Sequence, residues 1–175
     1  LREPMRLAFI VAAVSLRGAD ISRLTNFPGK YETDGKVSVV SGRDKPITGM
    51  VKMRFTIAKD GKSARLKISG KLDLPDETKN QFSTSLILRG GRRAIFTNLA
   101  PGFEDRRSGK GIYSASRQRI SAKADLVFTG VRGGATFLVE LQRVGDDRRL
   151  SVVQTLDTSE LAQPITWKFS ALRDP

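Results

Sequence analysis

The sequence predicts an all-β fold, either an antiparallel up-and-down barrel or a meander β-sandwich, with about 8–9 strands. Apolar and polar residues alternate with period two along most of the chain. Glycine-containing turns separate these segments at short, even spacing. The sequence contains no segment of ten or more residues with the periodicity of a helix. Sequential hairpins of this kind favour a barrel, because closure removes the exposed edges of long amphipathic strands.

The clearest alternation runs through residues 47–57 and 64–74, and its parity flips across Asp60-Gly61. An Asp-Gly pair between two alternating segments is typical of a two-residue hairpin turn. Such a turn lets every apolar residue meet an apolar partner, as a correct register requires. The predicted pairs are Ile57 with Ala64, Phe55 with Leu66, and Met53 with Ile68.

The remaining elements follow in order along the chain. Residues 20–26 predict a short helical or 3₁₀ lead-in, and residues 30–40 predict a strand with a bulge at Asp34-Gly35. Alternating segments then predict strands at 82–88, 95–99, 122–128, 135–141, 150–156 and 165–171. Residues 100–111 are expected to form a long loop, and a loop of that length in a compact domain is often functional.

Two further hairpins are predicted from their turns. Gly90-Gly91 suits a two-residue turn that places Leu86 opposite Ile95 and Thr84 opposite Thr97. A turn through Gly145–Arg148 places Leu141 opposite Val152 and Phe137 opposite Leu156.

Composition excludes several classes of function. The chain of 175 residues has the usual length of one domain, so we expect residues 20–175 to form a single β-barrel. It contains neither histidine nor cysteine, which removes the commonest general base, the commonest metal ligand and the thiol nucleophile. We therefore expect no enzyme activity, no catalytic residue, no metal site and no cofactor.

The first 19 residues have the order of a secretory signal peptide. Met5-Arg6 supplies a positive start, and a short apolar run follows at 7–16. Cleavage near Ala19 would give a secreted or periplasmic protein of bacterial type, with no transmembrane segment in the mature chain. The alternative is a cytoplasmic protein whose first segment packs on the core.

The residues before the first long strand, Asn26-Phe27-Pro28-Gly29-Lys30-Tyr31, carry a family resemblance. They resemble the lipocalin (calycin) opening, in which an aromatic residue precedes Gly-x-Trp at the floor of a barrel, with Tyr31 here in place of tryptophan. Arg173 resembles the basic residue that packs over that tryptophan late in the barrel. Through the strand count the resemblance extends to most of residues 29–173. It implies an eight-stranded cup that binds a small apolar ligand at its open end, without catalysis.

The face predicted to point inward is mainly aliphatic and aromatic, with a few polar members. In a ligand cup such polar groups fix the orientation of a ligand against an apolar wall. The alternative is that these side chains simply fill a small barrel. The candidate ligand-binding residues are Tyr31, Phe55, Thr84, Thr97, Phe137, Gln154 and Trp167.

The outward face of the first hairpin is basic, in a chain whose 31 Lys and Arg against 18 Asp and Glu give a net charge of +13. The predicted register places Arg54 opposite Lys67, and like charges directly across a sheet are destabilising unless an anion lies on them. The candidate anion-binding residues are Lys52, Arg54, Arg65, Lys67 and Lys71. The alternative is a solvated surface whose lysines guard against aggregation.

The sequence therefore predicts a secreted, non-enzymatic binding protein that holds a small apolar or amphipathic ligand inside a barrel. The alternatives are a surface binder of polyanions, such as lipopolysaccharide or acidic glycan, and a structural envelope protein. Nucleic acid is not expected as a partner, because no nucleic-acid-binding motif accompanies the basic residues.

Overall fold

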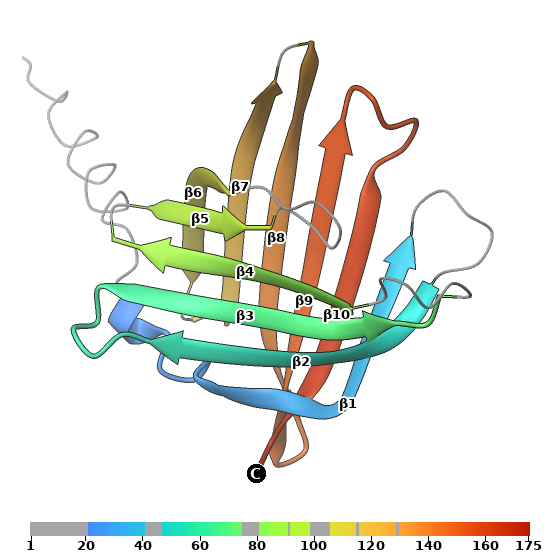
Figure 1. The fold of residues 1–175 in the computed structure, drawn as a ribbon. Helices are drawn as coiled ribbons and strands as arrows, with labels where there is room; N and C mark the ends of the chain where they lie inside the picture. The colour runs from blue at the N-terminus through green and yellow to red at the C-terminus, as the bar shows by residue number, and fades with distance from the viewer. Residues whose placement is uncertain are drawn as a thin grey trace, which may run out of the picture.

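The computed structural model describes residues 21–40, 47–74, 81–90, 92–98, 106–114, 116–128 and 130–175. Ten antiparallel strands pair in chain order, and β1 pairs with β10, so that the sheet closes into a barrel (Figure 1). A short 3₁₀ helix, η1 (Ile21–Arg23), precedes the strands. The strands are β1 (Gly29–Val40), β2 (Ile47–Ile57), β3 (Ser63–Leu72), β4 (Gln81–Arg89), β5 (Arg93–Thr97), β6 (Arg107–Ser114), β7 (Arg119–Phe128), β8 (Val131–Val144), β9 (Asp147–Thr158) and β10 (Ile165–Arg173).

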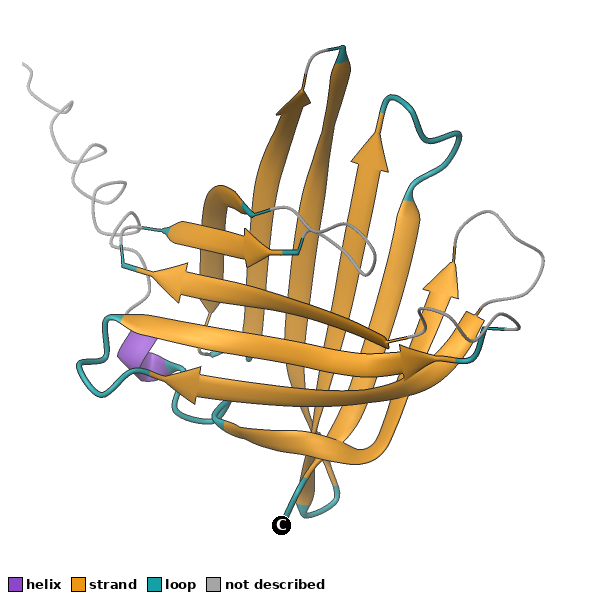
Figure 2. Cartoon of the chain, viewed as in Figure 1, coloured by secondary structure: helices purple, strands orange, loops and turns teal. Residues whose placement is uncertain are grey.

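The up-and-down barrel predicted from the alternation is confirmed, with ten strands in place of eight or nine. The inward residues of β2 show why the pattern has period two: Val51, Met53 and Phe55 are each 2% exposed, whereas the residues between them face solvent. Figure 2 shows that strands make up nearly all of the described chain. A barrel of ten strands departs from the eight of a lipocalin, so the resemblance holds for the closed meander alone.

The missed strand is β6, which lies where the sequence predicted a loop. Residues 107–111 belong to this strand and pair with β5 and β7. Two glycines, Gly109 and Gly111, interrupt the alternation there and weaken the strand signal. A Cβ on Gly109 would collide with the carbonyl oxygen of Lys123, so close backbone packing explains that glycine. Residues 99–105 lie outside the described residues.

The first hairpin has the predicted register. Ile57 pairs with Ala64, Phe55 with Leu66, and Arg54 with Lys67. The connection contains four residues rather than two, because the Ala58 amide still bonds to the Ser63 carbonyl at 2.9 Å. Both loop lengths are centred on the Asp60–Gly61 bond, and Gly61 has the positive φ of 68° that the turn needs. The pairing of β2 with β3 is therefore the same for the predicted two-residue turn and the observed four-residue connection.

The predicted bulge in β1 is also confirmed. The register against β2 shifts between Tyr31 and Val37, and Asp34 adopts a φ of 58°. The backbone approaches the neighbouring strand so closely that a Cβ on Gly35 would collide with the Val51 carbonyl oxygen. This bulge bends β1 and gives the barrel one of its corners.

Two predicted registers are wrong. In β4–β5 the connection is residues 90–92, since Arg89 pairs with Arg93, and Leu86 faces Phe96 rather than Ile95. Arg92 at a φ of 62° closes this three-residue loop. In β8–β9 the turn contains only Gly145-Asp146. The pairs that form are Phe137 with Gln154, Val139 with Val152, and Leu141 with Leu150.

The two ends of the barrel differ in their connections. The odd-numbered strands begin at the end that holds η1, which we call the floor, and the even-numbered strands begin at the other end, which we call the mouth. The mouth-side connections include residues 41–46, 75–80 and 99–105, which lie outside the described residues, as does the predicted leader at 1–19. Within the described ranges, no helix combines the length and apolar character needed to cross a membrane.

Candidate functional site

The floor of the barrel is sealed by the residues that lead into β1. Ile21, Leu24 and Phe27 are 3%, 1% and 0% exposed. The Phe27 ring packs on Phe55 with 5.3 Å between centroids. The Tyr31 hydroxyl donates a hydrogen bond of 2.6 Å to the Phe27 carbonyl oxygen, which fixes the lead-in against the first strand. This end therefore offers no entry between the lead-in and β1 or β2.

Arg173, the basic residue singled out near the end of the chain, lies beside the start of β1. Arg173 pairs with Tyr31 across β1 and β10, and its guanidinium lies over Gly29, where a Cβ would approach Nε to 2.9 Å. Burial raises the pKa of the Tyr31 hydroxyl, and the positive charges of Arg173 and Arg148 partly offset that shift. Tyr31 thus stays protonated as a donor over the physiological range.

A polar bridge crosses the barrel interior between β4 and β9. The Gln154 amide nitrogen lies 3.4 Å from the Thr84 hydroxyl, which donates in turn to the Asn98 carbonyl oxygen at 2.6 Å. Both side chains are buried, at 0% and 1% exposure. In the closed strand order β4 and β9 lie five strands apart in either direction, so this bridge joins opposite walls. The barrel is therefore flattened, and its interior is narrow at that level.

Aromatic contacts fill more of the interior. The rings of Phe82 on β4 and Phe169 on β10 lie 5.6 Å apart, and those of Phe96 on β5 and Phe137 on β8 lie 5.3 Å apart. Each pair joins strands that are not neighbours in the sheet. The part of the interior between these contacts and the floor is a packed hydrophobic core rather than an open cup.

The mouth keeps a ring of apolar side chains that are only partly buried. These residues pack against the core but retain exposure, and they come from β2, β3, β4, the β9–β10 connection and β10: Ile47, Leu72, Phe82, Leu161 and Ile165. Trp167 lies beside this ring, because it pairs with Gln154 on one side and with Val39 on the other, and Val39 pairs with Ile47. Consecutive cross-strand pairs from Gln154 through Trp167 and Val39 to Ile47 thus connect the polar bridge to the apolar rim.

The structure separates the predicted interior residues into three groups. Tyr31 and Phe55 are buried toward the floor, whereas Thr84, Gln154 and Trp167 lie at the base of the mouth, where Phe137 is the cross-strand partner of Gln154. Thr97 is misplaced in the prediction, since it pairs with Ser85 and lies on the face of β5 opposite to buried Ala94 and Phe96. The three-residue turn at 90–92 moves the register by one and so reverses the face.

The predicted anion-binding residues are all exposed on the outer face of β2 and β3. Lys52 has a partner of its own, since its ammonium lies 3.6 Å from the Glu32 carboxylate. Arg54 faces Lys67 as predicted, and the structure adds Lys30, which faces Arg54 from β1. The position of Lys30 could not be predicted from the sequence, because the bulge at Asp34 shifts the register between β1 and β2.

A second group of facing cations lies across β4, β5, β6 and β7. Arg89 faces Arg93, Arg93 faces Lys110, and Lys110 faces Lys123. In the sequence, Arg89 and Arg93 flank the Gly90-Gly91 turn, and Lys110 lies in the segment 100–111 that is expected to form a loop. The alignment in a single row is not predicted, because it depends on β6 lying in that segment.

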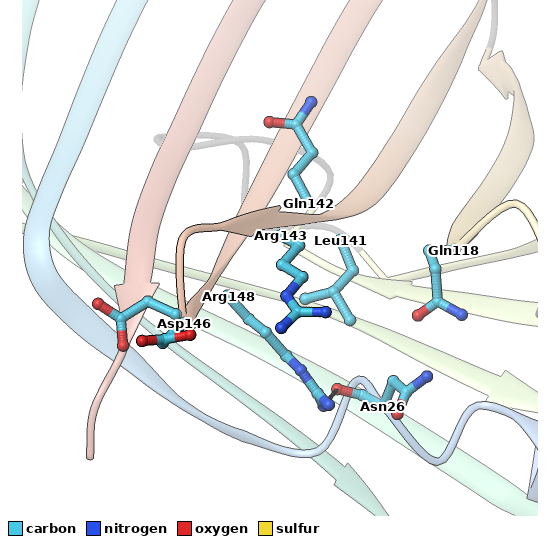
Figure 3. A pocket seen from close by; sticks show the side chains of 8 residues that line it. Asn26, Gln118, Leu141, Gln142, Arg143, Asp146 and Arg148 are labelled. Atoms are coloured by element: carbon cyan, nitrogen blue, oxygen red, sulfur yellow. Dashed lines mark hydrogen bonds between the residues drawn. The ribbon is translucent and has the colours of Figure 1, made fainter.

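A pocket on the outside of the floor has a volume of about 430 Å³ (Figure 3). Figure 3 shows the Arg148 guanidinium reaching toward Asn26, whose backbone carbonyl oxygen it bonds at 3.0 Å. Asp146 and Asp147 lie in the same wall. Charges of both signs line this pocket, so it does not select an anion, and the described residues contain no cluster of acidic side chains that could hold a metal ion.

Comparison with known proteins adds little to this geometry. No family model matches the chain, and a search of curated proteins finds no relative. Among solved structures the chain is similar to BcnA of Burkholderia cenocepacia, with 14% sequence identity and a TM-score of 0.41. That match covers 80% of this chain and 96% of BcnA. Similarity at this level supports no conclusion about function, and the barrel assignment depends on the strand pairing itself.

Proposed function

We propose that this protein is a non-enzymatic binding protein that holds a small apolar or amphipathic molecule at the mouth of its barrel. The observation that carries this proposal is the contrast between a sealed floor and a rim of partly exposed apolar side chains, among them Ile47, Phe82 and Ile165. An apolar wall with a few fixed polar groups is the usual composition of a small-molecule site.

The base of the mouth supplies groups that could orient such a ligand. Gln154 and Thr84 form the polar bridge, and Trp167 is adjacent to Gln154 in the ladder. We propose that the ligand lies against this base with its apolar part on the rim. Tyr31 and Phe55 then support the barrel from its floor side, and Phe137 supports Gln154, its cross-strand partner.

The leader-like composition of residues 1–19 supports a location outside the cytoplasm. The lack of cysteine suits an extracytoplasmic protein that does not depend on disulfide bonds. Native mass spectrometry of the protein expressed with its own leader tests both ideas. We expect a chain shortened near Ala19 and an additional mass that is lost on denaturation.

Trp167 allows binding to be measured directly, because it is the single tryptophan of the chain. A dansyl-labelled long-chain fatty acid bound at the mouth should accept energy from its indole. Ile47 and Ile57 provide a matched pair, since they begin and end β2 at opposite ends of the barrel and both are partly buried.

We expect Ile47→Asn to weaken binding of this probe about tenfold, because one apolar contact worth about 1.4 kcal/mol is lost. Ile57→Asn should leave the affinity unchanged, and circular dichroism confirms that both variants are folded. Equal losses in the two variants, or no energy transfer in the unmodified protein, would remove the mouth as the binding site.

A further inference from the structure

The outer wall carries four cations in one lateral row, Arg89, Arg93, Lys110 and Lys123, which we call the β4–β7 row. Each residue is the direct cross-strand partner of the next, and all four are exposed. Neighbouring strands lie about 4.8 Å apart, so the row spans roughly 14 Å. Aligned like charges at this spacing repel one another and destabilise the sheet.

Among the described residues, no member of the row has an ion-pair partner. Within the described residues the ion pairs join Lys52 to Glu32 and Arg119 to Glu140, and neither includes a member of the row. Asp125 lies two residues beyond Lys123 on β7 and forms no described ion pair with it. The five strands from β2 to β6 contain no Asp or Glu and nine basic residues: Lys52, Arg54, Arg65, Lys67, Lys71, Arg89, Arg93, Arg107 and Lys110.

This arrangement differs from a surface that is charged only for solubility, in which both signs are mixed. Charges of both signs do occur on β8 and β9, where Glu140 and Asp157 stand among the basic residues. Because the excess is confined to neighbouring strands and aligned across them, we propose that the β4–β7 row binds a linear acidic polysaccharide, whose carboxylate or sulfate groups supply the missing negative charge.

The shape of the wall favours a flexible chain over a flat anionic surface. In Figure 1, β4 and β5 run across the view whereas β7 runs up it, so the row passes round a corner of the barrel. A chain can follow that corner, but a bilayer meets only one side of it. Among the described residues, the exposed large hydrophobic side chains on the row's strands are Ile112 and Val127, at 65% and 72% exposure, and aliphatic side chains offer no stacking surface for nucleic acid bases.

A second row extends the path for such a chain. Lys30, Arg54 and Lys67 face one another across β1, β2 and β3. Arg65 lies between the two rows. On β3 it is two residues from Lys67, and on β4 its partner Ile87 is two residues from Arg89. The proposal concerns the outer wall alone and does not depend on a ligand at the mouth.

The test compares two charge-reversal variants with the same change in net charge. Arg93→Glu/Lys110→Glu alters the centre of the β4–β7 row. Lys36→Glu/Lys168→Glu alters exposed residues on β1 and β10, away from the row. Binding to heparin, to an oligothymidylate and to vesicles containing anionic phospholipid is measured as a function of salt concentration.

We expect the row variant to bind heparin at least tenfold more weakly than the unmodified protein, with a shallower salt dependence, whereas the control keeps most of its affinity. The neutral variant Arg93→Gln/Lys110→Gln should show a smaller loss in the same direction. Equal losses in row and control variants would show that net charge alone is responsible and overturn the proposal. A row-dependent affinity that is higher for the oligonucleotide or the vesicles than for heparin would also overturn it.

Discussion

The floor and the mouth of this barrel are built from the same alternating strands but differ in what covers their apolar ends. At the floor, the lead-in places Leu24 and Phe27 over the interior, and both are buried completely or nearly so. At the mouth, Ile47 and Ile165 stay partly exposed beside the buried Trp167. Closing a barrel laterally therefore does not close it axially, and each end needs its own cover.

The polar bridge between Gln154 and Thr84 marks the boundary between the two ends. On its floor side most inward aliphatic and aromatic side chains are buried, and Ile57 and Leu141 at the strand ends are partly buried. A buried polar pair costs stability unless its hydrogen bonds are made, which fixes both side chains in place. The boundary can thus serve as a rigid base for whatever occupies the mouth.

The largest expected effect comes from removing a ring at each end. Phe27→Ala should lower the free energy of unfolding by about 3–5 kcal/mol, because a fully buried ring leaves a cavity beside Phe55. Phe82→Ala should cost roughly 1–2 kcal/mol, since that ring is only partly buried. Urea denaturation measures both, and equal losses would mean that the mouth is packed as tightly as the floor.

Removal of the polar bridge should have the next largest effect. Thr84→Val keeps the volume but removes the hydroxyl that bonds to the Asn98 carbonyl and lies next to the Gln154 amide. We expect a loss of about 1–3 kcal/mol in the free energy of unfolding. Thr136→Val on the exposed face of β8 is the control and should change stability little. A loss as small as that of the control would show that the bridge does not hold the two walls together.

The hydrogen bond at the floor should make stability depend on pH in the alkaline range. Tyr31→Phe should cost about 1 kcal/mol at neutral pH, because the bond to the Phe27 carbonyl is lost. Burial raises the pKa of Tyr31 in the folded state, so its contribution is complete below the unfolded pKa of about 10 and declines as the pH rises through the folded value. Thermal unfolding at increasing pH should show the two proteins converging, and a constant difference would contradict this account.

The smallest expected change in stability concerns Arg143 and Arg148, which line the pocket on the outer side of the floor. Arg148→Gln removes the 3.0 Å bond to the Asn26 carbonyl oxygen and should cost about 0.5–1 kcal/mol. Arg143 faces Arg148 across β8 and β9, but among the described residues its guanidinium bonds to the carbonyl oxygen of Gly145, two residues away. Arg143→Gln should therefore be neutral or slightly stabilising. A loss in Arg143→Gln equal to that in Arg148→Gln would mean that the contact with the lead-in contributes nothing specific.

Much of the fold follows from the sequence alone, and the reasons are local. Period-two alternation identifies a half-buried strand without knowledge of its partner, so nine of the strands were predicted close to their observed positions. The Asp60-Gly61 turn also set the register of the first hairpin, because the apolar faces match in only one alignment. Gly109 and Gly111 concealed β6, since Gly109 packs closely against the Lys123 backbone and Gly111 leaves room for the Leu88 side chain.

The sequence by itself determined the class of fold, the inward residues of most strands, the excess of positive charge and the facing pair Arg54 and Lys67. The tertiary structure decided the loop lengths that set the face of Thr97, the bridge between Thr84 and Gln154, and the alignment of Arg93 with Lys110. Some of these features join residues far apart in the chain. The others depend on a strand register, which one added loop residue shifts by one and so turns side chains to the opposite face. Local alternation carries no information about either, which is why only the closed barrel reveals them.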